Sequence, residues 1–181
     1  LLASSAASDV YKRQEETLHS LHGNLGIGHV RYSTAGGSLV QNCQPLLMRY
    51  VKGRLAIAHN GNLTNSRELR QELESRGSIF QTTTDSEVIA YIIVQERLNR
   101  GSIEEAVSAA MDRIEGAYSL VLSSPTKLIA ARDPHGFRPL CMGHLKDGSV
   151  VFASESCALD AIGAEFERDI RPGEIVAVSY T

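Results

Sequence analysis

The segment His59-Asn60-Gly61-Asn62 carries two groups that could stabilise a negatively charged oxygen. The Asn60 side-chain amide and the Gly61 backbone N–H can point at one position, as needed for the oxyanion that forms when an amide carbonyl is attacked. The alternative is a simple turn, because Asn-Gly is the dipeptide most typical of tight hairpins. A helix, and not a returning strand, is predicted after this segment, which weakens the hairpin interpretation.

Two charged residues could bind the opposite ends of a free amino acid. Arg31 opens a polar loop, where a guanidinium can bind a carboxylate through two parallel hydrogen bonds, or can form a surface ion pair. Asp85 begins a predicted helix, where its carboxylate can bind an ammonium group or simply stabilise the positive end of the helix dipole. Together with Asn60 and Gly61, these residues describe a site for glutamine or asparagine. The set includes no nucleophile with an obvious activating base.

Other polar clusters have weaker signals. The segment RDPHGFRPL, at 132–140, could bind an anion or could fix a loop through a structural ion pair, and we favour the structural interpretation. The six histidines show no HxxxH or HExxH spacing, so no metal site is predicted. His29 and His59 are expected to be buried and hydrogen-bonded beside the candidate site.

Strands are indicated where apolar residues alternate or cluster between turn residues. The strands on either side of Lys52-Gly53 are expected to form a hairpin, and so are those around Arg171-Pro172-Gly173. Asn60-Gly61 is expected to end the strand before it, and a long loop is expected at 31–45. The predicted strands are 26–30, 46–50, 55–59, 118–122, 128–131, 140–145, 150–153, 166–170 and 174–178.

Helices are predicted between the first and second sets of strands. Asn65 and Glu68 form a pattern like a capping box, which would start the first helix. Others are expected to begin at Thr84 and Ser102, with a short one at 156–163. Strands, then helices, then strands joined by tight turns indicate an antiparallel α+β domain and not a doubly wound parallel sheet.

The composition is that of a globular domain of 181 residues, with 43% hydrophobic and 22% charged residues. A net charge of -3 gives no basic surface for nucleic acid, and no apolar run is long enough to span a membrane. Three cysteines without CxxC spacing favour a reducing compartment. Residues 1–14 have low complexity and no continuing period, so they are expected to be a non-native leader.

Eight motifs occur in order along the chain. They are GHVRYSTAG (28–36), QP (44–45), HNGNLTN (59–65), TDSEV (84–88), GAYSLV (116–121), RDPHGFRPL (132–140), SESCAL (154–159) and RPGEIV (171–176). Together they resemble the glutaminase domain of the glutamine phosphoribosylpyrophosphate amidotransferase family, from about Leu18 to Val178.

The resemblance implies an N-terminal-nucleophile hydrolase fold, a four-layer sandwich with two antiparallel sheets between helix layers. The family's nucleophile is a cysteine at the mature N-terminus, activated by its own α-amino group. By motif, Arg31 and Asp85 resemble the pair that anchors glutamine, and Thr34 resembles a further glutamine contact. Asn60 and Gly61 resemble the oxyanion hole.

The resemblance also implies that the loop 35–42 closes over bound glutamine. The family's cysteine and first strands are expected before Leu18 and are absent, and Cys43, Cys141 and Cys157 lack a neighbouring free α-amino group. We therefore expect residues 15–181 to be a class II glutaminase domain truncated at its N-terminus, without the phosphoribosyltransferase domain. On its own it is expected to be inactive.

For the longer protein, the resemblance implies the first committed step of purine biosynthesis, which makes phosphoribosylamine from glutamine and phosphoribosylpyrophosphate. No cofactor is expected in this chain. Mg²⁺ is implied for the phosphoribosyltransferase domain, and an iron–sulfur cluster is left open. A cytoplasmic homo-oligomer is expected, with no nucleic-acid or membrane partner.

Three alternatives stay open. The glutaminase domain of glucosamine-6-phosphate synthase shares Arg31 and Asn60, but typically has Trp-Ala-Thr-His after the arginine, where this chain has Tyr32-Ser33-Thr34-Ala35. Asparagine synthetase shares the Asn-Gly pair but not RDPHGFRPL. The third alternative is a non-catalytic module that binds glutamine through Arg31 and Asp85.

Overall fold

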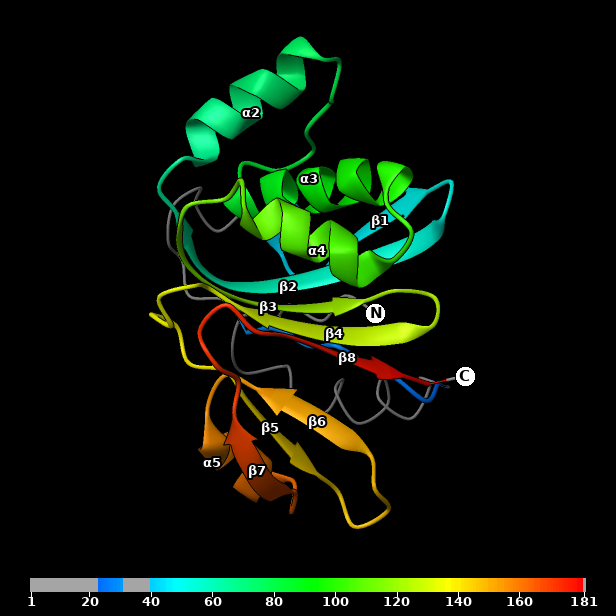
Figure 1. Ribbon diagram of the computed structural model, residues 1–181, viewed down its shortest axis with the longest axis vertical. Helices are drawn as coiled ribbons and strands as arrows, with labels where there is room; N and C mark the ends of the chain where they lie inside the picture. The colour runs from blue at the N-terminus through cyan, green and yellow to red at the C-terminus, as the bar shows by residue number, and fades with distance from the viewer. Residues whose placement is uncertain (1–22, 31–39, 181) are drawn as a thin grey trace.

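The computed structural model describes residues 23–30 and 40–180 of the chain, which are drawn as coloured ribbon in Figure 1. The predicted leader at 1–14, and with it Arg31 and Thr34, lie outside the described residues. The predicted loop 35–42 is described only at its end, where a short 3-10 helix, η1, spans Val40–Asn42. All statements on structure below concern the described ranges.

A five-stranded antiparallel sheet runs through the centre of the fold, in the order β1-β2-β3-β4-β8. Tyr50 pairs with Gly53, so the predicted hairpin around Lys52-Gly53 is confirmed. The α+β class with antiparallel sheets is also confirmed. The strands are β1 (Leu46–Tyr50), β2 (Gly53–Leu63), β3 (Gly116–Ser123), β4 (Lys127–Arg132) and β8 (Ile175–Ser179).

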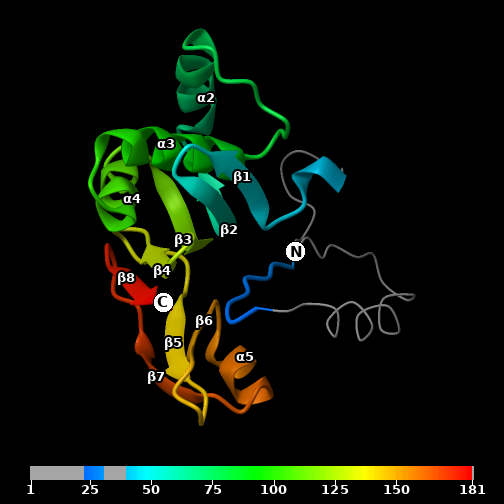
Figure 2. The same cartoon turned by 90° about the vertical axis from the view of Figure 1, so that its right-hand side faces the viewer.

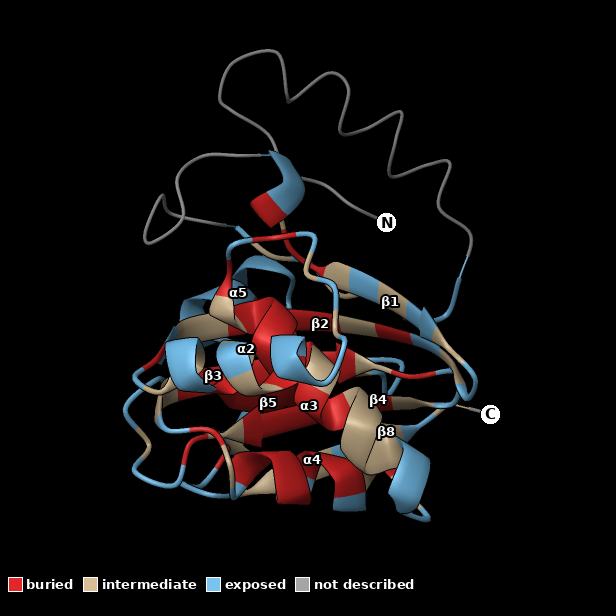
Figure 3. Cartoon of the chain, turned by 90° about the horizontal axis from the view of Figure 1, so that it is seen from above, coloured by how far each residue is buried: buried red, intermediate tan, exposed pale blue. Residues whose placement is uncertain are grey.

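Helices cover one face of this sheet, as Figure 1 shows from the side. They are α3 (Asp85–Asn99) and α4 (Ile103–Met111), and α2 (Ser66–Ser75) packs on α3 on the side away from the sheet. Alternate residues of the strands, such as Ile57 and Leu120, are fully buried against helix residues such as Ile89 and Ile92. Figure 3 shows the buried residues of α3 and α4 gathered over the strands. This core holds the start of α3 against β2.

A second antiparallel sheet packs on the other face of the first. Its order is β6-β5-β7, with β5 (Cys141–His144), β6 (Val150–Ala153) and β7 (Glu165–Asp169). Met142 and Phe152 pack against Ala130 of β4, whereas Cys141 packs against Leu159 of α5 (Ser156–Ala161). Figure 2 shows α5 beside the second sheet, away from α2, α3 and α4. Side chains therefore alternate between the first sheet and α5, as expected of strands buried on both faces.

Two predicted strand arrangements are wrong. Residues 26–30 form no strand, because a strand requires a paired neighbour and no described strand pairs with this segment. The strands around Arg171-Pro172-Gly173 form no hairpin: β7 pairs with β5, whereas β8 pairs with β4. The turn between them therefore carries the chain from one sheet to the other.

The prediction that Asn60-Gly61 ends its strand is also wrong. Strand β2 continues through this dipeptide to Leu63 and stays paired with β3. Gly61 has φ +151, and a Cβ there would lie 2.0 Å from the carbonyl oxygen of Ala117. Glycine is therefore required for close approach of two strands and not for a turn.

Local capping is mixed. Ser102 caps α4 as expected, because its Oγ accepts the N–H of Glu105. The Asn65 side chain does not cap α2. It donates to the Arg113 carbonyl and accepts the N–H of Glu115, so it ties the start of α2 to the connection between α4 and β3. The capping-box prediction at Asn65 is wrong because this tertiary contact takes the side chain.

The loop that begins at Asp133 is fixed from inside. Asp133 is fully buried, and its carboxylate accepts four backbone N–H groups, including those of His135 at 2.9 Å and Phe137 at 3.2 Å. Arg132 donates to three backbone carbonyls, among them Ile170 at 2.7 Å. The structural interpretation of RDPHGFRPL is confirmed, with backbone hydrogen bonds in place of the predicted ion pair.

We expect Asp133→Ala to destabilise the chain by about 3 kcal/mol or more, because it leaves several buried N–H groups without an acceptor. Urea unfolding of the purified chain measures this. Asp147 accepts the Ser149 N–H in an exposed turn, so Asp147→Ala is the matched control and should change stability much less. Equal stability of the two variants would contradict the role given to Asp133.

Candidate functional site

Strand β2 is longer than its neighbour β1. The last residues of β2 therefore have no described strand paired with them on the side of β1. Strand β1 pairs with β2 only from Gly53 to Ile57. Strand β3 pairs along the other edge as far as Leu63. Backbone N–H groups after Ile57 on the first edge therefore need acceptors from elsewhere.

Side chains satisfy two of these N–H groups. The N–H of His59 donates to Gln44 Oε1 at 2.6 Å, and the N–H of Leu63 donates to Asp85 Oδ2 at 2.9 Å. Because N–H direction alternates along a strand, the Gly61 N–H lies on the same edge, between these two. It is therefore the donor that the edge presents outward.

Asn60 lies on the sheet face opposite to His59, because successive side chains of a strand alternate. This is the face on which Val121 of β3 packs toward the second sheet. Asn60 is half-buried, and within the described ranges its side-chain amide forms no hydrogen bond. The Asn60 amide and the Gly61 N–H are thus neighbouring donors at the end of the open edge.

Asp85 is the first residue of α3 and faces the end of β2. Its Oδ2 accepts the N–H of Leu63, its Oδ1 lies 3.6 Å from His59 Nδ1, and its side chain is 19% exposed. Burial acts to raise the pKa of Asp85. Hydrogen bonding and charge from His59, with the N–H groups of Leu63 and Ser86, outweigh burial and lower that pKa below its usual value. The carboxylate is therefore held ionised, as binding of an ammonium group requires.

His59 is buried and hydrogen-bonded beside Asp85, as predicted. Its Nδ1 lies 3.1 Å from Ser86 Oγ, and its backbone N–H donates to Gln44. Its Nε2 is buried, and no described group is bonded to it. Because a buried donor without an acceptor is destabilising, a proton on Nδ1, which faces Ser86 and Asp85, fits this ring better than one on Nε2.

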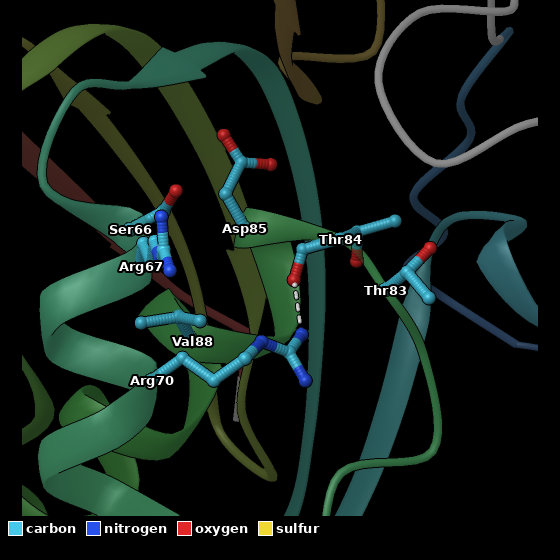
Figure 4. Close-up of a pocket in the computed structure, with 7 residues that line it drawn as sticks. All are labelled: Ser66, Arg67, Arg70, Thr83, Thr84, Asp85 and Val88. Carbon is cyan, nitrogen blue, oxygen red and sulfur yellow. Dashed lines mark hydrogen bonds between the residues drawn. The ribbon is translucent and has the colours of Figure 1, made fainter.

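A small cavity of about 210 Å³ lies between the starts of α2 and α3. Arg70 on its wall donates to the carbonyls of Thr82 and Thr84. Figure 4 shows the Arg70–Thr84 bond, with the Asp85 carboxylate pointing away from Arg70. Arg70 therefore fixes the turn before Asp85. The lining residues are Ser66, Arg67, Arg70, Thr83, Thr84, Asp85 and Val88.

The structure brings Asp85 to the end of the strand that carries Asn60 and Gly61, since Asp85 accepts the N–H of Leu63, two residues beyond Gly61. It also shows that Asn42, at the end of the predicted glutamine loop, and Gln44 are both buried and bonded near this strand end, which was not predicted. Gln44 belongs to a quoted motif, but nothing in its local sequence signals a bond to the backbone of β2.

Comparison with known proteins shows the family of this chain. Residues 29–161 match the family model described as a glutamine amidotransferase domain. The chain belongs to the glutamine amidotransferase family. The matched range includes Asn60, Gly61 and Asp85.

Known relatives of this amidotransferase domain are amidophosphoribosyltransferases. That of Methanocaldococcus jannaschii is 50% identical over 94% of this chain and 36% of its own length, and the chloroplastic one of Vigna aconitifolia is 51% identical over 96% and 35%. The solved structure of glutamine phosphoribosylpyrophosphate amidotransferase from B. subtilis, complexed with ADP and GMP, has TM-score 0.76 and 41% identity, covering 83% of this chain and 32% of that one. The chain thus spans about a third of the length of these relatives.

The lowered pKa of Asp85 gives a pH-dependent contribution to stability. A carboxyl whose pKa is lower in the folded state stabilises the fold fully above its unfolded pKa, and this contribution is lost as pH falls through the folded pKa. We expect Asp85→Asn to destabilise the chain most above the ordinary pKa of 3.8, with the difference from the unsubstituted chain shrinking below it. Denaturant unfolding at a series of pH values measures this difference. A difference that stays constant from pH 6 to pH 3 would contradict it.

Proposed function

We propose that this amidotransferase domain hydrolyses the side-chain amide of glutamine, using Asn60 and Gly61 as its oxyanion hole. The observation that carries the proposal is the edge of β2. The N–H groups of His59 and Leu63 are already accepted, so the Gly61 N–H remains as a donor beside the Asn60 amide. A pair of fixed donors is what the tetrahedral oxyanion of amide hydrolysis requires.

The substrate would be bound at both ends. Asp85, held ionised and partly exposed, would accept the α-ammonium group. Arg31 would bind the α-carboxylate through two hydrogen bonds, with Thr34 as a further contact, although both lie outside the described residues. The side-chain amide would then lie against Asn60 and Gly61.

The nucleophile would be the family's cysteine at the mature N-terminus, and not a cysteine of the described strands. Cys141, for example, is buried in β5 and donates to the Ala153 carbonyl, and burial raises the pKa of its thiol. The terminal thiolate would attack the glutamine amide carbon, and the C–N bond would break as the leaving nitrogen takes a proton and departs as ammonia. Water would then hydrolyse the glutamyl thioester to glutamate.

The longer protein would use this ammonia. The relatives are named amidophosphoribosyltransferases, and one solved relative with 43% identity is titled an allosteric regulatory enzyme of purine biosynthesis. We propose that residues 15–181 form the glutaminase domain of such an enzyme, which makes 5-phosphoribosylamine from glutamine and phosphoribosylpyrophosphate. The packing of helices, two sheets and α5 supports the four-layer N-terminal-nucleophile hydrolase fold.

The proposed cofactors belong to that longer protein. Over residues 23–30 and 40–180, no three His, Cys, Asp or Glu side chains are placed to hold a metal ion. No helix in the same ranges is long and apolar enough to cross a membrane. A homo-oligomer and a cytoplasmic location remain predictions, and the V. aconitifolia relative is named chloroplastic.

In the complete protein that carries this domain, we expect Asn60→Asp to reduce glutamine-dependent turnover at least about a hundredfold, because one oxyanion donor is typically worth roughly 3–4 kcal/mol. Turnover with added ammonia should be spared, since it does not need the glutamine site. Both rates are measured on one preparation. Unchanged glutamate release would exclude Asn60 from the oxyanion hole.

A second candidate function is glutamine binding without turnover. It is favoured by the described site itself, whose groups bind and polarise but do not attack. We expect the 181-residue chain alone to release no glutamate above background, because its proposed nucleophile is a terminal cysteine that these residues do not supply. A glutaminase assay and calorimetric titration with glutamine test this. Release above background would refute the need for that cysteine, and heat of binding without release would support the second function for the chain alone.

A further inference from the structure

Asn42 and Gln44 are buried polar residues that the proposed chemistry does not use. Asn42 is 0% exposed and Gln44 is 7% exposed. Asn42 accepts the N–H of Thr83 at 3.1 Å and donates to Thr83 Oγ1 at 3.0 Å. Gln44 accepts the N–H of His59 at 2.6 Å. Buried side chains that bind two separate segments need a reason, because an apolar residue would be easier to bury.

These bonds close a ring around the site. Gln44 reaches β2 at His59, and the His59 ring reaches the start of α3 at Ser86 and Asp85. Asn42 reaches the turn before α3 at Thr83, and a single residue separates Asn42 from Gln44 along the chain. The ring therefore links the strand that carries the proposed oxyanion hole to the helix start that carries the proposed ammonium-binding carboxylate.

We propose that Asn42 and Gln44 are positioning residues that set the separation between the Asn60–Gly61 donors and Asp85, and thereby select glutamine over asparagine. This inference rests on the proposed glutaminase function. Glutamine and asparagine carry the same α-ammonium and α-carboxylate groups and the same side-chain amide. They differ by one methylene between the α-carbon and that amide. A site that holds both ends rigidly therefore discriminates by length.

The geometry at Gln44 explains why a side chain is needed there. Strand β1 begins at Leu46, opposite Ile57, so the His59 N–H lies just beyond the last strand pair. The Gln44 amide oxygen takes the place that a further strand residue would fill. It fixes the backbone of β2 at His59, immediately before Asn60, so loss of this acceptor should affect mainly the reacting end of the substrate.

The bonds of Asn42 act on the other end of the site, where Asp85 would bind the ammonium group of the substrate. Two hydrogen bonds from Asn42 hold Thr83, two residues before Asp85, and Arg70 holds the carbonyl of the intervening Thr84. Release of Thr83 would let the start of α3 shift relative to β2. Displacement of about 1 Å at a reacting centre can cost a hundredfold in rate. A modest shift of α3 relative to β2 would therefore be enough to weaken discrimination between substrates by their length.

The test compares matched variants in the complete protein, with kcat and KM measured for glutamine and for asparagine. Gln44→Met keeps the shape and removes the acceptor, whereas Gln44→Glu keeps an acceptor oxygen. We expect Gln44→Met to lower kcat for glutamine about tenfold with little change in KM. Asn42→Leu should instead raise KM for glutamine about tenfold with little change in kcat, and Asn42→Asp, which still accepts the Thr83 N–H, should recover most of the loss.

Selectivity is the deciding measurement. In Gln44→Met and Asn42→Leu, the ratio of kcat/KM for glutamine to that for asparagine should fall at least about tenfold, the range that one methylene typically controls. An unchanged ratio, with a lower melting temperature alone, would show that both residues are merely structural and overturn the inference. If a variant does not fold, Gln44→Asn or Asn42→Ser, which shorten the reach of the same side chain, carry the same expectation.

Failure of the proposed function gives a different result. An unsubstituted protein that releases no glutamate from glutamine would refute the glutaminase assignment itself. An active unsubstituted protein whose variants keep their selectivity would refute only the role of Asn42 and Gln44.

Discussion

The free edge of β2 is the constraint on which the site depends. A strand that outruns its neighbour leaves backbone N–H groups that must find acceptors, because buried and unpaired they would destabilise the fold. Gln44 and Asp85 supply acceptors for His59 and Leu63. Their side chains bring the segments around them to the edge of β2. The Gly61 N–H, between those of His59 and Leu63, is left without such an acceptor in the described part of the chain. One requirement of backbone hydrogen bonding thus assembles the candidate site and leaves the Gly61 N–H as its proposed donor.

The antiparallel α+β class could be predicted from sequence, because alternation and turn residues are local signals that most strands of this fold obey. The errors arise where pairing is decided at a distance. Asn60-Gly61 reads locally as a turn, yet the close approach of Ala117 on β3 requires a glycine in continuous strand. Likewise β7 and β8 flank a turn typical of a hairpin but belong to different sheets, because each pairs with a strand far along the chain.

The candidate site could also be predicted only in part, because local signals are readable from the sequence and long-range contacts are not. The residue types and positions of Asn60, Gly61 and Asp85 are enough to suggest their chemistry, and the fold places Asp85 against Leu63, two residues beyond Gly61. The bonds of Asn42 and Gln44 could not be predicted this way, because they join backbone groups distant in sequence, and any buried polar residue could form them. Asn65 shows the converse: its local capping signal is overridden by bonds to Arg113 and Glu115.

Asp85 joins stability and proposed substrate binding in one side chain. An ionised carboxylate offers about four acceptor positions, so bonds to Leu63 and His59 leave room for an ammonium group. The same bonds lower the pKa of Asp85, so the carboxylate is already ionised before a substrate ammonium group would bind. A bound ammonium would favour the ionised form further, and by linkage a ligand that binds only the folded chain stabilises it. Substitution of Asp85 therefore cannot separate binding from folding. Substitutions at Asn42 and Gln44 leave the charged group in place, so a change in selectivity in those variants would report on the proposed spacing of the site.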